Sequence, residues 1–295
     1  MPSLSLLQTF FREVITRERS KRVTEPNLVM DDPDKVAAYT RAGREDGVMA
    51  PVYLFHCAQI CEVIKPGDTV VDLGCGPATQ LAMVARLNPD ATVIGIDLSD
   101  EMLHRARDYV GGQSLRNVEF QAGDISNLAM FPDASVDALY STVALHHLPD
   151  FATLEKTFSE ISRVLKPGGG LYVVDFGHLK SEKSIAYFAH QYARQQPELF
   201  TLDYLYSLRA AFSRDDFVAL TKKYFGERMA VKSTFLMPYM VAVKSPPRAD
   251  LNNTLLKGEL KNLYNRLPGY HKKDLSDLTL FFRLGGLQSQ YLSHL

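Results

Sequence analysis

Short β-rich runs alternate with amphipathic helical segments through the middle of the chain. Five runs are typical of buried strands: residues 69–73, 91–97, 118–122, 136–141 and 171–176. Helical periodicity is expected between them, over residues 80–87, 99–109 and 151–165. Because strands that alternate with helices are joined by right-handed crossovers, the pattern predicts an α/β fold with a parallel sheet covered on both faces.

The first residues predict an amphipathic helix. Its apolar residues recur with helical spacing and share one face: Leu4, Leu7, Phe11 and Val14 or Ile15. A basic run over residues 17–22 follows. We interpret this run as the solvated end of a helix, and a local patch for an anionic partner is the alternative.

The alternation breaks after the fifth strand. Residues 181–225 are aromatic-rich and helical in pattern, and β-rich runs near 229–235 and 238–244 bring the expected strands to seven. Pro246-Pro247 then marks a boundary before a last helical segment. The expected organisation has three parts: an N-terminal helical extension (1–35), a central domain (36–245) and a C-terminal helical extension (246–295).

Composition narrows the class of protein. The chain has 295 residues, of which 46% are hydrophobic, and this share excludes intrinsic disorder. Lys plus Arg number 33 and Asp plus Glu number 34, so the net charge is −1. No global basic field exists to attract nucleic acid or an anionic membrane.

The cysteines and the termini suggest a compartment. Three cysteines make no disulfide framework, which indicates a reducing setting. We find no apolar run of about 18 residues and no signal-peptide pattern. We therefore expect a cytoplasmic protein without a membrane span, with a homodimer as an open possibility.

A glycine-rich turn joins the first strand to its helix. Gly74 and Gly76 let the backbone turn tightly and approach a ligand, and the helix that follows offers free N–H groups, so the turn suits a nucleotide-like ligand. A dinucleotide fingerprint requires glycine where Thr79 stands, which makes a nicotinamide dehydrogenase the weakest alternative. Asp72 places negative charge at the strand end, which favours a ligand with an ammonium group, such as S-adenosylmethionine.

The segment Asp72-Leu-Gly-Cys-Gly-Pro-Ala78 resembles motif I of the class I S-adenosylmethionine-dependent methyltransferases, with Ala78 at the usual third glycine position. Later landmarks follow in the family's order, so the resemblance spans about residues 36–177. It implies a Rossmann-like, doubly wound, mostly parallel seven-stranded sheet with helical N-terminal, cap and C-terminal additions. It also implies S-adenosylmethionine as the methyl donor and S-adenosylhomocysteine as the product.

The resemblance assigns residues to parts of the donor. Asp97 would hold the ribose hydroxyls, Leu98 and Met102 would pack on the adenine, and Asp124 would accept from the adenine amino group. Tyr39 would close over the methionine end, or else pack the N-terminal helix. The remaining implied donor contacts are Asp72, Gly74, Cys75, Gly76, Gly123, Ile125 and Thr142.

Methyl transfer from a sulfonium is a direct displacement that needs alignment and, for some acceptors, a general base. His146 and His147, just past the fourth strand, are the candidate bases; their alternative role is to orient the loop. We find no convincing metal-ligand spacing and expect metal-independent transfer. In relatives, an insertion after the fifth strand often forms a cap, so residues 181–225 would choose the substrate. Within them, Tyr187, His190, Tyr204 and Tyr206 either line a pocket or pack a helical layer.

The expected function is transfer of a methyl group to O, N or C of a small-molecule acceptor. One alternative is an RNA or protein methyltransferase, although the near-neutral charge argues against RNA. Another is a non-catalytic subunit that binds S-adenosylmethionine.

Overall fold

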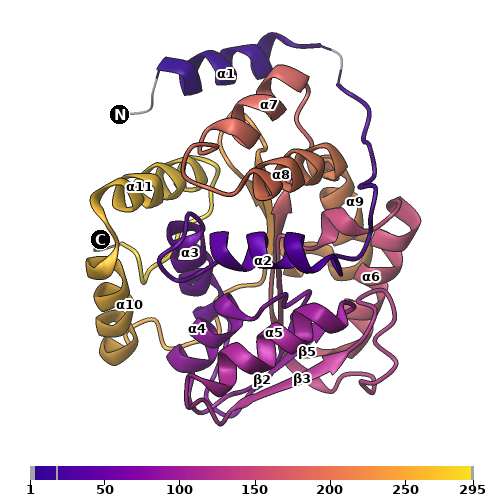
Figure 1. Ribbon diagram of the computed structural model, residues 1–295. Helices are drawn as coiled ribbons and strands as arrows, with labels where there is room; N and C mark the ends of the chain where they lie inside the picture. Colours follow the sequence, from indigo (N-terminus) through magenta and orange to yellow (C-terminus); the bar gives the residue numbers. More distant parts are fainter. Residues whose placement is uncertain (1–3, 18, 294–295) are drawn as a thin grey trace.

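The computed structural model describes residues 4–17 and 19–293, and a seven-stranded sheet runs through its centre (Figure 1). The strands are β1 (Thr69–Leu73), β2 (Thr92–Asp97), β3 (Val118–Ala122), β4 (Val136–Thr142), β5 (Leu165–Phe176), β6 (Ala230–Ser233) and β7 (Met240–Lys244). Their order across the sheet is β3-β2-β1-β4-β5-β7-β6. Only β7 runs antiparallel to its neighbours, β5 and β6. The expected Rossmann-like, mostly parallel seven-stranded sheet is confirmed.

Eleven α-helices surround the sheet within the described residues. They are α1 (Leu4–Ile15), α2 (Pro33–Ala42), α3 (Ala50–Cys61), α4 (Thr79–Leu87), α5 (Asp100–Gly111), α6 (Phe151–Val164), α7 (Glu182–His190), α8 (Glu198–Ala210), α9 (Arg214–Phe225), α10 (Thr254–Arg266) and α11 (Gly269–Leu284). A 3₁₀ turn, η1 (Leu145–His147), follows β4. None of these helices combines the length and the apolar character that crossing a bilayer requires.

Alternate residues of the central strands enter two separate apolar cores. In β1, Val70 packs into the core that also contains α3 and α4, whereas Val71 packs into the core that contains α6 and α9. Tyr172 and Val173 of β5 divide in the same way. Both faces of the central strands are therefore buried, which explains why strands such as β1 and β4 are largely continuous hydrophobic runs.

Strand β5 begins earlier than the sequence pattern predicts. Residues 166–170, which lie between the expected helix (151–165) and the expected strand (171–176), are part of β5, and α6 ends at Val164. The register shifts between the Val136–Leu165 and Ala138–Gly170 pairs, so the glycines are accommodated as an irregularity within the strand. Gly170 is required there, because a Cβ atom would lie 2.1 Å from the backbone oxygen of Val63.

Helices from both ends of the chain form a cap beside the sheet. In Figure 1 the indigo α1 and α2, the orange α7 and α8, and the yellow α11 gather at the end of the molecule opposite β2 and β3. Helix α1 packs on α7, and α8 packs on both α7 and α2. The predicted amphipathic helix is present as α1, but its apolar stripe is exposed.

Candidate active site

The glycine-rich turn after β1 is held in an unusual backbone conformation. Gly74 and Gly76 have φ angles of +75° and +52°. A Cβ atom on Gly74 would lie 2.5 Å from the Cβ of Ala144, so the turn also requires a residue without a side chain. The amide of Gly76 donates to Oδ2 of Asp97 over 2.8 Å, which ties this turn to the end of β2.

A cavity opens beside this turn, outside the carboxyl ends of β1 and β2, and we call it the donor cavity. The predicted donor residues that line it are Tyr39, Gly74, Gly76, Asp97, Leu98, Met102, Asp124 and Ile125. Gly123 is not among its lining residues; its amide donates to the backbone oxygen of Asp97 over 3.0 Å. Residues Leu28, Val29 and Met30, which the sequence analysis did not predict, cover part of the cavity.

Asp97 is fixed in position before any ligand binds. Its Oδ1 accepts from the amide of Ser99 over 2.9 Å, and its Oδ2 accepts from the amide of Gly76. A carboxylate has about four acceptor positions, so two stay available for a ribose diol. Burial raises the pKa of Asp97, although these backbone bonds oppose the rise.

A small cleft adjoins the donor cavity and contains the predicted residues Asp72, Cys75 and Thr142. Thr142 donates to Oε1 of Gln80 over 2.6 Å. Oδ1 of Asp72 and Nε2 of Gln80 are buried, and neither has a hydrogen-bond partner in the described part of the chain. The cleft is therefore lined by one residue with an unpaired buried acceptor and one with an unpaired buried donor, groups of the kind that pair with the ammonium and the carboxylate of an amino acid.

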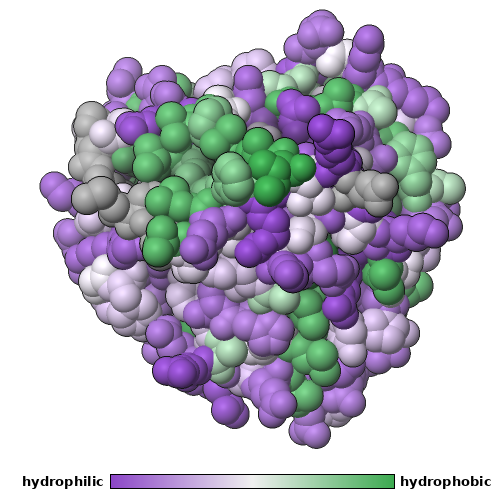
Figure 2. Space-filling model, turned by 90° about the horizontal axis from the view of Figure 1, so that it is seen from above, coloured by the Kyte–Doolittle hydropathy of each residue, from purple (hydrophilic) through white to green (hydrophobic). Residues whose placement is uncertain are grey.

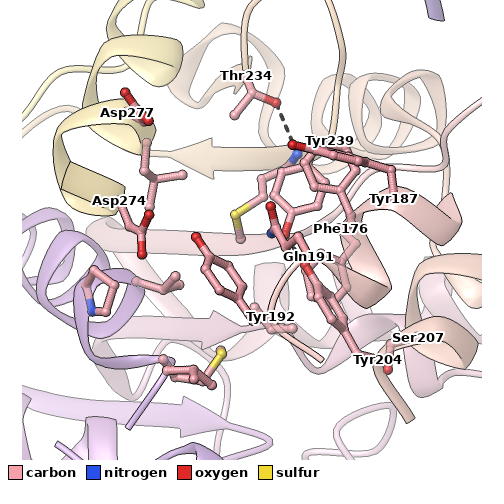
Figure 3. Close-up of a pocket in the computed structure, with 18 of the residues that line it drawn as sticks. Phe176, Tyr187, Gln191, Tyr192, Tyr204, Ser207, Thr234, Tyr239, Asp274 and Asp277 are labelled. Atoms are coloured by element: carbon pink, nitrogen blue, oxygen red, sulfur yellow. Dashed lines mark hydrogen bonds between the residues drawn. The ribbon is translucent and has the colours of Figure 1, made fainter. Parts of the chain in front are cut away.

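A second cavity lies under the cap, and we call it the acceptor cavity (Figure 3). Figure 3 shows aromatic side chains from several elements around it, including Phe176 of β5, Tyr204 of α8 and Tyr239 from the segment before β7. Of the four residues for which the sequence left lining or packing open, Tyr187 and Tyr204 line this cavity, while His190 and Tyr206 are absent from its lining.

The two cavities share three lining residues, Tyr39, Val143 and His147. Tyr39 also lines the small cleft, so it stands where all three spaces meet. Burial raises the pKa of Tyr39, which keeps its phenol protonated at neutral pH.

A carboxylate from the N-terminal segment accompanies His147. Oε2 of Glu25 lies 2.7 Å from Nδ1 of His147, and Oε1 of Glu25 accepts from the hydroxyl of Ser207 over 2.8 Å. The side chain of Glu25 is 4% exposed, whereas that of His147 is 29% exposed. Burial lowers the pKa of His147, but the hydrogen bond and the charge of Glu25 outweigh this effect and leave it raised.

His146 is held differently. Its Nδ1 lies 2.8 Å from Oδ1 of Asp175, and its backbone amide donates to Oδ2 of the same residue over 3.0 Å. The side chain is 2% exposed, and its Nε2 lies 3.8 Å from Oε1 of Glu25. These contacts suit a residue that shapes the turn after β4 more than one that exchanges protons with a ligand.

Arg22 holds the N-terminal segment against this turn. Its guanidinium donates to the backbone oxygens of His146, Leu148, Pro149 and Ala210 at distances between 2.6 and 3.2 Å. The predicted solvated helix end is therefore wrong for Arg22, while Glu18 of the same run lies outside the described residues.

Glu25, His146 and His147 also offer atoms that suit a metal ion, all within 4.8 Å of one another. The sequence gives no local signal for this group, because Glu25 and His147 are 122 positions apart in the chain. The hydrogen bond between Glu25 and His147 already engages one atom of each, so we interpret the group as a proton-handling arrangement.

Comparisons with known proteins agree with this geometry. A family model described as a methyltransferase domain matches residues 70–169. Trans-aconitate 2-methyltransferase of Deinococcus radiodurans is 43% identical over 109 residues, which are 37% of this chain and 38% of that protein. Arsenite methyltransferase of Halobacterium salinarum is 36% identical over 113 residues, which are 38% of this chain and 28% of that protein. The chain thus spans well under half the length of these relatives.

A solved structure extends the likeness beyond the matched stretch. The plantazolicin methyltransferase BpumL, in complex with S-adenosylhomocysteine, aligns with a TM-score of 0.55 over 90% of this chain and 95% of that chain, at 17% identity. At this identity the alignment shows a shared fold. The fold is Rossmann-like. Residues 70–169 match a methyltransferase domain, which agrees with the resemblance to the class I S-adenosylmethionine-dependent methyltransferases.

Proposed function

We propose that this protein transfers a methyl group from S-adenosylmethionine to a small, largely apolar acceptor. The observation that carries the proposal is the shared wall between the two cavities, made by Tyr39, Val143 and His147. A donor in one cavity and an acceptor in the other would meet there. Proximity and alignment of this kind supply up to about 7–11 kcal/mol in well-oriented systems.

The residues around the donor cavity suit each part of this donor. Asp97 has acceptor positions for the ribose, and the apolar side chains of Leu98 and Met102 suit the adenine. The unpaired atoms of Asp72 and Gln80 in the small cleft suit the amino-acid end. Bound there, S-adenosylmethionine supplies an activated methyl group on its sulfonium.

We further propose that His147 is the general base and that Glu25 positions it. The acceptor would lose its proton to Nε2 of His147 as the new bond to the methyl group forms and the carbon–sulfur bond breaks. Nδ1–H of His147 would donate to Glu25, which orients the ring and stabilises the imidazolium that results. A base at this position favours an acceptor that carries an O–H or an N–H group.

The charges of the acceptor cavity further limit which acceptors are expected to bind. Its lining includes three carboxylates, Asp203, Asp274 and Asp277. Its one lysine, Lys273, is paired with Asp277 over 2.7 Å. We therefore expect a neutral or cationic acceptor with an aromatic or aliphatic body. The relative named for trans-aconitate matches this chain over about a third of its length, so its acceptor is not carried over.

Binding and turnover test the proposal separately. Calorimetry should show that the protein binds S-adenosylmethionine and S-adenosylhomocysteine, and a panel of apolar phenols and amines should reveal turnover to S-adenosylhomocysteine. Donor binding without turnover on any acceptor would favour the non-catalytic subunit. Turnover on RNA or protein alone would favour a macromolecular substrate. A homodimer and a cytoplasmic location stay predictions.

A further inference from the structure

Helix α1 exposes one apolar side and buries a mixed side that contains Thr9, Phe10 and Glu13. Its five large outward-facing apolar residues are between 51% and 73% exposed: Leu4, Leu7, Phe11, Val14 and Ile15. Figure 2 looks onto this side of the molecule and shows a continuous green patch over it. Soluble surfaces rarely expose so many large apolar side chains on one helix face, and such faces mark interaction sites.

Contacts on the inner side hold the helix in this orientation. The carboxylate of Glu13 is buried and accepts from the amides of Lys180 and Ser181, at the start of α7. The ring of Phe10 lies 4.7 Å from the ring of Phe281 in α11, measured between centroids. Turning the apolar stripe inward would break these contacts, so its exposure follows from how α1 is anchored.

The charge near this face is positive. Arg12 lies in the last turn of α1, and Arg17 and Lys21 follow the helix; Glu18 stands among them in the sequence, and Arg19 lies 3.6 Å from the carboxylate of Asp215. Glu13 does not offset them at the surface, because it is buried on the inner side. An exposed apolar stripe beside a cluster of basic residues is the pattern of a helix that lies in the interface of an anionic bilayer.

We propose that α1 is an interfacial helix that docks this face of the protein on a membrane containing anionic lipid. The apolar stripe would enter the boundary between headgroups and acyl chains, and the basic residues would meet the lipid headgroups. The proposal stands on α1 alone and holds whether or not the protein is a methyltransferase.

If the proposed function is also correct, docking would place the acceptor cavity next to the membrane. Leu6 and Phe10, on the inner side of α1, line that cavity. One helix thus separates an apolar, aromatic cavity from the docking face. This arrangement points to a membrane-dissolved acceptor, which the lipid phase would concentrate at the cavity.

Vesicle co-sedimentation of the full chain tests the docking. One set of vesicles contains phosphatidylcholine alone, and the other contains about 30% phosphatidylserine. We expect binding to the anionic vesicles that weakens as salt rises, and weaker binding to phosphatidylcholine alone. The double variant Leu7→Glu/Phe11→Glu should lower the affinity for anionic vesicles by about tenfold or more. Arg12→Glu should lower it less.

Leu255→Glu is the matched control, because Leu255 is 82% exposed on α10, outside the α1 stripe. It should leave vesicle binding unchanged. Circular dichroism and donor calorimetry on each variant would show that the fold and the donor cavity are intact. The proposal is overturned if the wild type binds neither vesicle, or if Leu255→Glu weakens binding as much as the α1 variant does. It is also overturned if the α1 variant instead turns a dimer into a monomer.

Discussion

Nδ1 of His147 lies 2.7 Å from Oε2 of Glu25, although 122 positions separate these residues in the chain. The pair joins the N-terminal segment to the turn after β4, at the wall between the two cavities. A buried carboxylate on one ring nitrogen leaves the other nitrogen as a proton acceptor of defined direction. Glu25 and His147 therefore have the geometry that the proposed general base and its positioning carboxylate require.

We expect Glu25→Gln to lower kcat by about tenfold to a hundredfold, because general-base catalysis as a whole contributes about 10²–10⁴-fold. The rate should fall as the pH drops through the pKa of His147, because only the neutral ring accepts a proton. Burial lowers the pKa of His147, but Glu25 raises it by more, so the net shift is upward. Removing the charge of Glu25 should therefore move the acidic limb of the pH–rate profile to lower pH. The pH dependence of kcat measures both effects.

Other charged groups near His147 also affect its pKa and so contribute to the pH dependence of kcat. Charges that influence its titration come from several elements: Asp203 of α8, Asp175 of β5, Asp97 of β2 and the neighbouring ring of His146. Ser207→Ala, which removes the second hydrogen bond of Glu25, should give a smaller shift in the same direction. An acidic limb that stays in place in Glu25→Gln would exclude Glu25 as the partner of the base.

Asp97→Ala should weaken donor binding by about 1–3 kcal/mol, because charge-assisted hydrogen bonds to the ribose would be lost. Part of this loss reflects the turn, since Asp97 also accepts from Gly76 and Ser99. Asp100→Ala is the control: Asp100 is exposed in the first turn of α5 and lies outside the donor cavity. Calorimetry that gives wild-type affinity for a folded Asp97→Ala protein would contradict the assignment.

Donor binding near pH 7 should release a proton. Burial raises the pKa of Asp72 to about 8, so its carboxyl group is mostly protonated before the donor arrives. The donor's ammonium group would favour the ionised form, and the affinity should therefore rise as the pH increases toward 8. Calorimetry in two buffers with different ionisation heats counts the protons, and Asp72→Asn should abolish the release. An equal proton count in both proteins would show that Asp72 does not meet the ammonium.

A chelator should leave the activity unchanged. We interpret Glu25, His146 and His147 as a hydrogen-bonded group, although their atoms would also suit a metal ion. Dialysis against a chelator, followed by activity measurement with and without added Mg²⁺, Mn²⁺ or Zn²⁺, decides between the two. Loss of activity that one of these ions restores would replace the general-base mechanism with a metal-assisted one.

The sheet could be predicted from the sequence because its strands have a strong local pattern. The central strands are buried on both faces, so β1 and β4 are short apolar runs next to turn residues. Helix α3 lacked such a pattern. Eleven of its twelve residues are buried, so it has no polar face and hence no helical periodicity to detect.

The residues proposed to bind the donor were easier to identify from the sequence than those of the proposed proton-handling group. Asp72, Gly74 and Gly76 lie within five positions of one another, next to a strand that is itself recognisable. Glu25 stands in a segment without regular structure, and only the folded chain brings it to His147. Gln80 would have been found by asking which polar residue in the first turn of α4 faces the glycine-rich turn.

The outward stripe of α1 shows a different limit. The pattern correctly predicted an amphipathic helix, but hydrophobic periodicity does not say whether the apolar side packs inward. The orientation depends on Glu13 and the amides of Lys180 and Ser181, which are far from it in sequence.

The stretch from Arg22 to Asp31 performs two tasks at once. Its residues Leu28, Val29 and Met30 line the donor cavity, and the hydroxyl of Ser99 donates to the backbone oxygen of Met30 over 2.9 Å. The same stretch also contains Glu25, which is hydrogen-bonded to His147. If this stretch lifts to let the spent nucleoside leave, the base loses its partner in the same movement. His147 would then be oriented as a base only while the donor cavity is closed. Exchange of the nucleoside and transfer of the methyl group would therefore occur at different times.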